Sequence, residues 1–171
     1  FVEQIDSLST IASEFSNFAK MPDTKLENLQ LLPIISQARD VFTSSEQVEI
    51  YILNHATTEV IVLGDKDQLL RTFNNLLKNA IEASSANDKC LIKIIITNDE
   101  KEVFIEVEDN GKGIDAQLQT KIFVPNFTTK SSGTGLGLAF VKQAVENAGG
   151  SVSFKSVVDG GTTFYLTFPL S

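Results

Sequence analysis

The stretch DNGKGID, residues 109–115, directly follows a strand-like run, VFIEVE, at residues 103–108. It combines an acid, an amide and two glycines two positions apart. Glycine lets the backbone adopt a positive φ angle, and it lets another group approach the main chain closely. Asn-Gly and Asp-rich sequences are also common in hairpin turns, so the heptad by itself indicates a turn more readily than a binding site. The segments around it decide between the two.

Helix-like and strand-like segments alternate around this heptad. Helical patterns cover residues 31–42, 67–84 and about 136–148. Strand-like runs cover residues 48–53, 59–64, 90–97, 102–108, 151–157 and 162–168. The pattern predicts an α/β fold, a two-layer sandwich in which about three helices lie on one face of a mixed, largely antiparallel sheet.

The helical segment 67–84 has two distinct faces. At 100° per residue, its large apolar residues share one arc, and a second arc carries Arg71, Asn75, Asn79 and Glu82. Asparagine is a mediocre helix former because its side chain competes for backbone hydrogen bonds. Two asparagines four apart therefore indicate either a solvated face or a polar site.

A glycine-rich segment precedes the last helical pattern. Gly133, Gly135 and Gly137 come immediately before a helix whose first turn must leave backbone N–H groups without helical partners. Such a helix start can bind phosphate oxygens. The order of residues is neither that of a P-loop nor that of a Rossmann fingerprint, so the segment predicts an anion site of another kind.

Residues 1–22 form a separate unit in the sequence. Ile5, Leu8, Ala12, Phe15 and Ala19 are spaced three and four apart, as in a coiled coil or helix bundle. We expect one bundle helix that packs on another chain or on a helix outside this sequence, and that ends at the proline of MPDTK. Residues 23–171 are then a second domain.

Composition narrows the partners. The 171 residues include 42% hydrophobic residues and carry a formal net charge of -8. This charge disfavours nucleic acid or an anionic membrane as the main partner, because both require clustered cations. The one cysteine, Cys90, opens the run CLIKIIIT and is expected to be a small buried residue. No apolar run reaches the roughly 18 residues of a membrane span.

Four segments carry a resemblance to a known family. NNLLKNAIEA (74–83), DNGKGI (109–114), FVPNFTTK (123–130) and GTGLGLAFVKQAVENAGG (133–150) follow one another here. They resemble, in order and spacing, the N, G1, F and G2 boxes of bacterial sensor histidine kinases, within the gyrase, chaperone, kinase and mismatch-repair ATPase superfamily. The resemblance covers residues 25–170 and implies a Bergerat-type ATP fold. EFSNFAKMP (14–22) resembles the second dimerisation helix of the nitrogen-regulation branch.

The resemblance implies roles for individual residues. Asn79 is expected to bind the Mg²⁺ that bridges the ATP phosphates, and Asn75 to support the phosphate side. Asp109 is expected to accept a hydrogen bond from the adenine amine, while Gly111 and Gly113 leave room for the base against the main chain. Thr163 is a second expected adenine contact, with a buried strand threonine as the alternative.

The phosphate end of the site is expected on residues 124–137. By resemblance, residues 124–134 form a lid over the phosphates. Lys130 in this lid can reach a phosphate, or is simply solvated. Backbone N–H groups before the last helix face the triphosphate. The expected nucleotide-binding residues in this segment are Phe127, Thr128, Thr129, Lys130, Thr134, Gly135, Leu136 and Gly137.

The resemblance also predicts the reaction. ATP-hydrolysing members carry a glutamate four residues before the magnesium asparagine, and here that position is Asn75, which cannot act as a general base. Transfer of the ATP γ-phosphate to a histidine is therefore favoured over hydrolysis. The only histidine, His55, precedes Ala56 rather than an acid and is expected in a surface loop. The accepting histidine is then expected on a dimerisation helix outside this sequence, in the same protomer or its partner.

The expected partners are that helix and a response regulator. The expected location is the cytoplasm, with any membrane anchor upstream of these residues. Two alternatives remain from sequence: a self-contained ATPase of the same superfamily, and a nucleotide-sensing module that transfers no phosphate.

Overall fold

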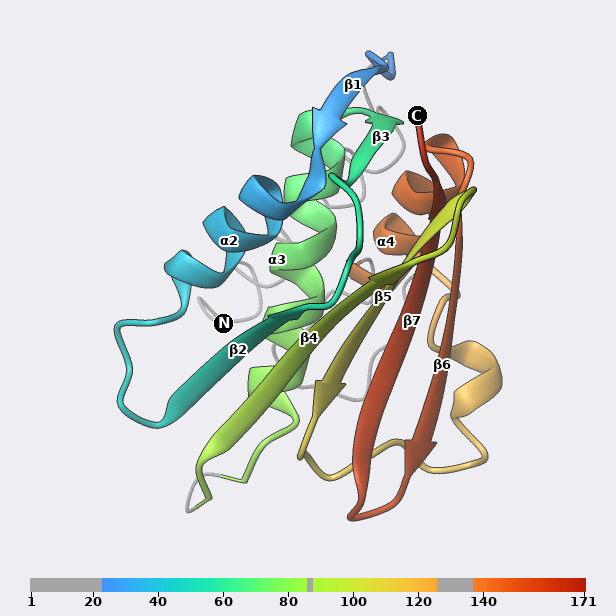
Figure 1. Ribbon diagram of the computed structural model, residues 1–171. Coiled ribbons are helices and arrows are strands. Elements are labelled where there is room, and N and C mark those ends of the chain that lie inside the picture. The colour runs from blue at the N-terminus through green and yellow to red at the C-terminus, as the bar shows by residue number, and fades with distance from the viewer. Residues whose placement is uncertain (1–22, 86–87, 126–136) are drawn as a thin grey trace, which may run out of the picture.

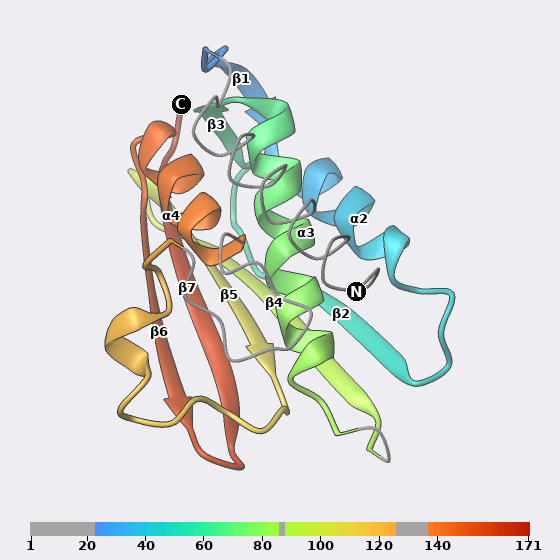
Figure 2. The same cartoon turned by 180° about the vertical axis from the view of Figure 1, so that it is seen from behind.

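A five-stranded sheet and three helices form two layers in a computed structural model that describes residues 23–85, 88–125 and 137–171. The three helices lie on one face of the sheet, as the two opposite views show (Figures 1 and 2). The predicted two-layer α/β sandwich is confirmed. The predicted bundle helix at 1–22 lies outside the described residues.

The sheet has the strand order β2-β4-β5-β7-β6. Its strands are β2 (Val48–Asn54), β4 (Cys90–Asn98), β5 (Glu102–Asp109), β6 (Ser151–Val157) and β7 (Gly161–Pro169). β2 pairs with β4 in parallel, and the other three pairings are antiparallel. The sheet is therefore mixed and largely antiparallel, as predicted, and β7 is a central strand although it is the last in the chain.

Alternation along the strands decides which residues face the helices. In β5, Val103, Ile105, Val107 and Asp109 are buried, whereas the residues between them are more exposed. Successive side chains of a strand point to opposite faces, so Asp109 continues the buried series. An acid thus ends the inner face of a central strand.

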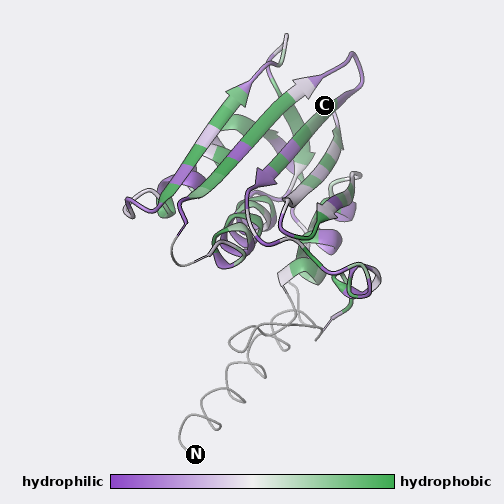
Figure 3. Cartoon of the chain, turned by 90° about the horizontal axis from the view of Figure 1, so that it is seen from below, coloured by the Kyte–Doolittle hydropathy of each residue, from purple (hydrophilic) through white to green (hydrophobic). Residues whose placement is uncertain are grey.

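Strands appear mostly green and the connecting loops mostly purple when coloured by hydropathy (Figure 3).

The helices are α2 (Leu31–Val41), α3 (Lys66–Glu82) and α4 (Gly137–Asn147). α3 begins after Asp65, whose side chain accepts a hydrogen bond from the backbone N–H of Gln68 at 3.1 Å. The apolar arc predicted for this helix is buried: Leu69, Phe73, Leu76, Leu77 and Ala80. α3 contacts both α2 and α4, which makes it the central helix of its layer.

A second, two-stranded sheet lies at the end of the domain that holds residue 23. It pairs β1 (Glu27–Gln30) with β3 (Ile61–Gly64), and Leu170 bridges Val62 beside it. The sequence predicted a strand at 59–64 but none at 27–30. β1 has four residues, of which one is buried, so it shows no alternation that a sequence pattern could reveal.

The chain just before β1 is fixed by side chains of α3 and α4. The Gln68 amide donates to Thr24 Oγ1 at 3.0 Å, and the Asn147 amide donates to Gln68 Oε1 at 3.2 Å. The backbone N–H of Lys25 donates to Asp65 Oδ2 at 2.9 Å. Gln68 is 6% exposed, whereas Thr24 and Lys25 are exposed, so a buried amide holds a surface segment of the chain.

The core makes a stability prediction. Phe73→Ala is expected to lower the free energy of unfolding by about 3–5 kcal/mol, because Phe73 is fully buried and its loss leaves a cavity. Val41→Ala, at a position 62% exposed, is expected to change it by less than about 0.5 kcal/mol. Urea denaturation of both variants measures the difference; equal effects would contradict the assigned core.

Candidate functional site

Asp109 lies where β5 ends and the DNGKG loop begins. Its Oδ1 accepts hydrogen bonds from two backbone N–H groups, that of Gly111 at 2.9 Å and that of Thr162 at 3.2 Å. The residue is 9% exposed. Both bonds fix the orientation of the carboxylate, so Asp109 is held in place before any ligand arrives.

The two glycines of the loop pack against protein. A Cβ on Gly111 would lie 2.8 Å from both the Cβ and the backbone oxygen of Ala83, which follows α3. Gly113 has a φ of +75°, and a Cβ there would lie 2.1 Å from the backbone oxygen of Val157. The sequence predicted these glycines as space for a base. The structure gives a different reason for them: close approach to α3 and to the end of β6.

Further hydrogen bonds attach the loop to its neighbours. The Asn110 side chain accepts from the N–H of Leu91 at 2.9 Å and donates to the backbone oxygen of Lys89 at 3.0 Å. The N–H of Lys112 donates to the Ala83 oxygen at 3.0 Å. The loop is thus joined to β4 on one side and to α3 on the other.

The strand register moves the second predicted adenine contact. Thr163 pairs with Glu108, which puts it on the outer face of the sheet, away from Asp109. Thr162 is 4% exposed, shares the inner face, and donates its N–H to Asp109. A one-residue shift along a strand reverses the face, so Thr162 rather than Thr163 lies beside Asp109. Gly161, which no sequence signal singled out, would place a Cβ 2.1 Å from the Asp109 backbone oxygen.

One of the two α3 asparagines contacts the start of α4. The Asn75 amide donates to the backbone oxygen of Gly137 at 3.2 Å, which joins two motifs 62 residues apart in the sequence. Asn79 lies one turn further along α3, and its backbone oxygen accepts from the N–H of Ala83 at 3.0 Å. Ala83 contacts the DNGKG loop, so the predicted metal residue and Asp109 belong to one connected region.

Cys90 lies beneath this region, at the start of β4. Its thiol is 3.8 Å from the Ala80 backbone oxygen. Burial is the main cause that raises the pKa of Cys90; a hydrogen bond with Ser84 opposes the shift, and the charge of Asp109 adds to it. The thiol therefore stays neutral, and Cys90 is the small buried residue that the sequence predicted.

Part of the predicted site lies outside the described residues. This applies to Phe127, Thr128, Thr129, Lys130, Thr134, Gly135 and Leu136. The described residues before them, through Pro125, run beside β6 (Figure 1), where Phe123 makes edge contacts with Phe154 and Phe164 at 5.9 and 6.3 Å between ring centroids. Phe123 thus docks this segment on the sheet.

His55 is an exposed residue after β2, as predicted. Its backbone N–H donates to the Ile96 oxygen at 2.8 Å. Asp109 pairs with Ile92, which lies four residues before Ile96 on β4. At about 3.3 Å per residue, the two positions are separated by roughly 13 Å along that strand.

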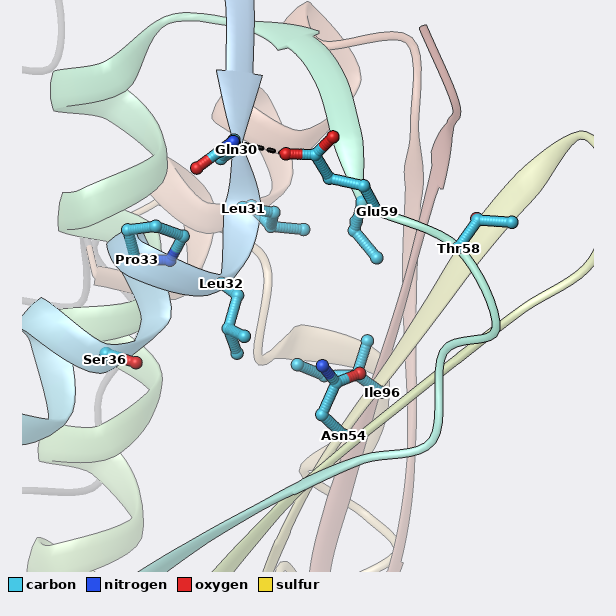
Figure 4. Close-up of a pocket in the computed structure, with 10 residues that line it drawn as sticks. Gln30, Leu31, Leu32, Pro33, Ser36, Asn54, Thr58, Glu59 and Ile96 are labelled. Carbon is cyan, nitrogen blue, oxygen red and sulfur yellow. Dashed lines mark hydrogen bonds between the residues drawn. The ribbon is translucent and has the colours of Figure 1, made fainter.

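A cavity of about 370 Å³ opens between the start of α2 and the end of β2 (Figure 4). Leu31, Leu32, Asn54 and Ile96 are among the residues that line it. Because it adjoins Ile96, it lies toward the end of β4 opposite Asp109. It is separate from the site that the motifs form.

The donor set limits what kind of metal site the described part of the chain could form. Among those residues, no group of three or more His, Cys, Asp and Glu side chains is placed to hold an ion. Mg²⁺ commonly keeps several waters and binds through one or two protein oxygens plus substrate phosphates. An amide oxygen on Asn79 beside a nucleotide fits that mode.

Comparison with known proteins identifies the family. Residues 64–171 match the family described as "Histidine kinase-, DNA gyrase B-, and HSP90-like ATPase". The chain belongs to this ATPase family. It is 31% identical to the histidine-protein kinase AtoS of Escherichia coli over 99% of the chain, and 33% identical to sporulation kinase A of Bacillus subtilis over 97%. It spans 28% of the length of each of these relatives.

A putative sensor histidine kinase, NtrY-like, of Rickettsia bellii is 30% identical over 99% of the chain, which again spans 28% of that protein. Among solved structures, the nucleotide-free catalytic domain of histidine kinase ThkA is 27% identical, with a TM-score of 0.75, covering 85% of this chain and 96% of that one. The domain is therefore of the histidine-kinase catalytic type.

Two longer solved structures share the fold at lower identity. ShkA in complex with AMPPNP gives a TM-score of 0.81 at 21% identity, covering 99% of this chain and 37% of that one. ThkA in complex with the response regulator protein TrrA gives a TM-score of 0.77 at 22% identity, covering 99% of this chain and 49% of that one. In the described part of this family member, no helix is long and apolar enough to cross a membrane.

The loop packing makes a prediction about Gly113. Gly113→Ala is expected to lower the free energy of unfolding by about 1–3 kcal/mol, because alanine disfavours the positive φ and its Cβ meets Val157. Lys112→Ala, which keeps the backbone bonds of that residue, is the matched control and is expected to change it little. Thermal unfolding of the two variants decides; a Gly113→Ala variant as stable as the control would contradict the packing role.

Proposed function

We propose that this chain binds Mg-ATP between the DNGKG loop, α3 and the start of α4, and transfers the γ-phosphate to a histidine on a helix outside this sequence. The observation that carries the proposal is the joining of three motifs through direct bonds. Asp109 is held by Gly111 and Thr162, the loop is bonded to Ala83 at the end of α3, and Asn75 is bonded to Gly137.

Asp109 selects adenine. Its carboxylate is oriented by two backbone N–H groups and can accept a hydrogen bond from an exocyclic amine at the inner edge of the sheet. Guanine carries a carbonyl at that position, which would face the carboxylate without a proton between them. Thr162 replaces Thr163 as the threonine beside the base. Gly111 and Gly113 act on the site through the shape of the loop.

The phosphates lie toward α3 and α4. Asn79 supplies an amide oxygen to Mg²⁺, and Asn75 and the first-turn backbone of α4 at Gly137 support the phosphate oxygens. When bound, Mg²⁺ neutralises charge on the transferring phosphoryl group. Phe127, Thr128, Thr129 and Lys130, with the N–H groups of Thr134, Gly135 and Leu136, complete this side. ShkA, which shares the fold, was solved in complex with AMPPNP, and this supports a nucleotide site on the present domain.

The reaction is transfer rather than hydrolysis. Asn75 stands where a glutamate would activate water, and its amide donates to the Gly137 oxygen. An amide cannot remove a proton from water near neutral pH. An imidazole nitrogen held in line with the γ-phosphorus can form the new P–N bond while the bond to the β-phosphate oxygen breaks. His55 is exposed on a loop away from Asp109, so the acceptor is supplied from outside this sequence.

The finer assignments rest on the sequence and on relatives. Residues 1–22 are proposed as the second helix of a dimerisation hairpin, and residues 23–171 as the ATP-binding domain. The segment EFSNFAKMP and the NtrY-like relative support the nitrogen-regulation branch. A response regulator is the proposed onward acceptor, in line with the ThkA complex with TrrA. We place the domain in the cytoplasm.

Nucleotide selectivity tests the role of Asp109. The chain is expected to bind Mg-ATP more tightly than Mg-GTP by calorimetric titration. Asp109→Asn keeps an oxygen for the N–H groups of Gly111 and Thr162 but removes the second acceptor, so ATP affinity should fall roughly tenfold or more with a small change in stability. Unchanged ATP affinity in Asp109→Asn would refute the adenine role.

Labelling tests the phosphotransfer. With γ-labelled ATP, this chain alone is expected to carry no acid-labile phosphate, and a protein extended upstream by the dimerisation helix is expected to be labelled on histidine. Asn79→Ala in the extended protein should abolish the label, since Mg²⁺ no longer has its amide ligand. His55→Ala is the control and should label normally. Acid-labile label on this chain alone, lost in His55→Ala, would overturn the proposal.

A further inference from the structure

The side chain of Arg71 stacks on an aromatic ring of the neighbouring helix. Its guanidinium carbon lies 4.1 Å from the centroid of the Phe140 ring. Phe140 belongs to α4 and is 3% exposed. Arginine keeps its charge at all ordinary pH values, and its planar group stacks well on aromatic faces. The contact is therefore a persistent cation–π pair between α3 and α4.

This pair stands next to the bond that joins the two motifs. Arg71 is one turn before Asn75 on α3, and Phe140 is three residues after Gly137 on α4, so each helix presents both of its residues on one face. Asn75 contacts Gly137, and Arg71 contacts Phe140. The first turn of α4 is thus held to α3 at two points, one by a hydrogen bond and one by stacking.

The first turn of α4 needs such support. It begins with a glycine, a poor helix former, and the end turns of short helices fray readily in the absence of packing. Its free N–H groups are useful for phosphate only when their positions are fixed. Stacking by Arg71 supplies that restraint from a position one turn away from Asn75.

We propose that Arg71 is a positioning residue, which holds the first turn of α4 against Asn75 through Phe140 and so sets the affinity for the triphosphate. The identity of the ligand in this inference rests on the proposed function, whereas the restraint on α4 rests on the structure alone. It differs from a direct role, in which the charge of Arg71 would act on the phosphates without Phe140.

The test uses four single variants of this chain, the double variant Arg71→Met/Phe140→Leu, and one control. Arg71→Met keeps the length of the stem, Arg71→Lys keeps the charge without the planar group, Phe140→Leu removes the ring, and Phe140→Tyr keeps it. Lys142→Met removes a cation from an exposed position on α4. Calorimetry with Mg-ATP and with adenosine measures binding. Amide hydrogen exchange of residues 141–144 in the nucleotide-free chain measures the restraint, because these N–H groups bond to the carbonyls of the first turn of α4.

The expected result is a matched loss. Arg71→Met and Phe140→Leu should each weaken Mg-ATP binding roughly threefold to tenfold, as a cation–π pair of this kind would give. The double variant should bind Mg-ATP no more weakly than the weaker-binding of the two single variants, since both substitutions disrupt the same contact. The Mg-ATP affinity of Arg71→Lys should lie between that of the parent and that of Arg71→Met. Phe140→Tyr and Lys142→Met should bind as the parent does. Adenosine affinity should stay constant, and exchange at 141–144 should accelerate in Arg71→Met and Phe140→Leu.

Other outcomes separate the hypotheses. A loss in Arg71→Met with no loss in Phe140→Leu, or additive losses, would overturn the positioning role in favour of a direct one. Equal losses of affinity for ATP and for adenosine would also overturn the positioning role, because the effect would then not be specific to the phosphates. A parent chain that binds no nucleotide would refute the proposed function. Hydrogen exchange would then test the restraint alone. Unchanged exchange in Arg71→Met and Phe140→Leu would overturn the restraint, and accelerated exchange would support it.

Discussion

The domain depends on how closely the DNGKG loop approaches the end of α3. Gly111 touches Ala83 with no space for a side chain, and the Ala83 oxygen accepts the N–H of Lys112. The same Ala83 N–H closes the last turn of α3 on Asn79. A loop that ends a strand and a helix that carries two asparagines are thereby fixed to each other, and Asp109 and Asn79 take positions that neither element could set alone. A bulkier residue at 111 would force the two apart.

Much of the fold was predictable because its signals are local. The apolar arc of α3 and the alternation along β5 follow from periods of 3.6 and 2, and both segments are long enough to show them. The position of Asp109 at the end of a strand was also evident. β1 escaped prediction because a four-residue strand with one buried side chain has no period to detect.

The site was predictable in its motifs and less so in its contacts. Thr163 was named as the threonine near the base because the sequence does not reveal the register of β7 against β5. The glycines were correctly marked as special, but their neighbours, Ala83 and Val157, are distant in sequence. The stacking of Arg71 on Phe140 joins residues 69 positions apart, on helices whose packing no local pattern specifies. Local periodicity can identify such faces, but only tertiary structure can pair them.

The central place of β7 has a consequence for synthesis of the protein. The sheet orders β7 between β5 and β6, yet β7 is the last of these strands to leave the ribosome. Until residue 162 has emerged, Asp109 lacks one of its two backbone donors, and β5 has an open edge. Long-range strand pairing is slow, and unpaired edges favour aggregation. The edge of β5 is thus exposed until β7 has been made, and termination between β6 and β7 leaves β6 without its partner strand.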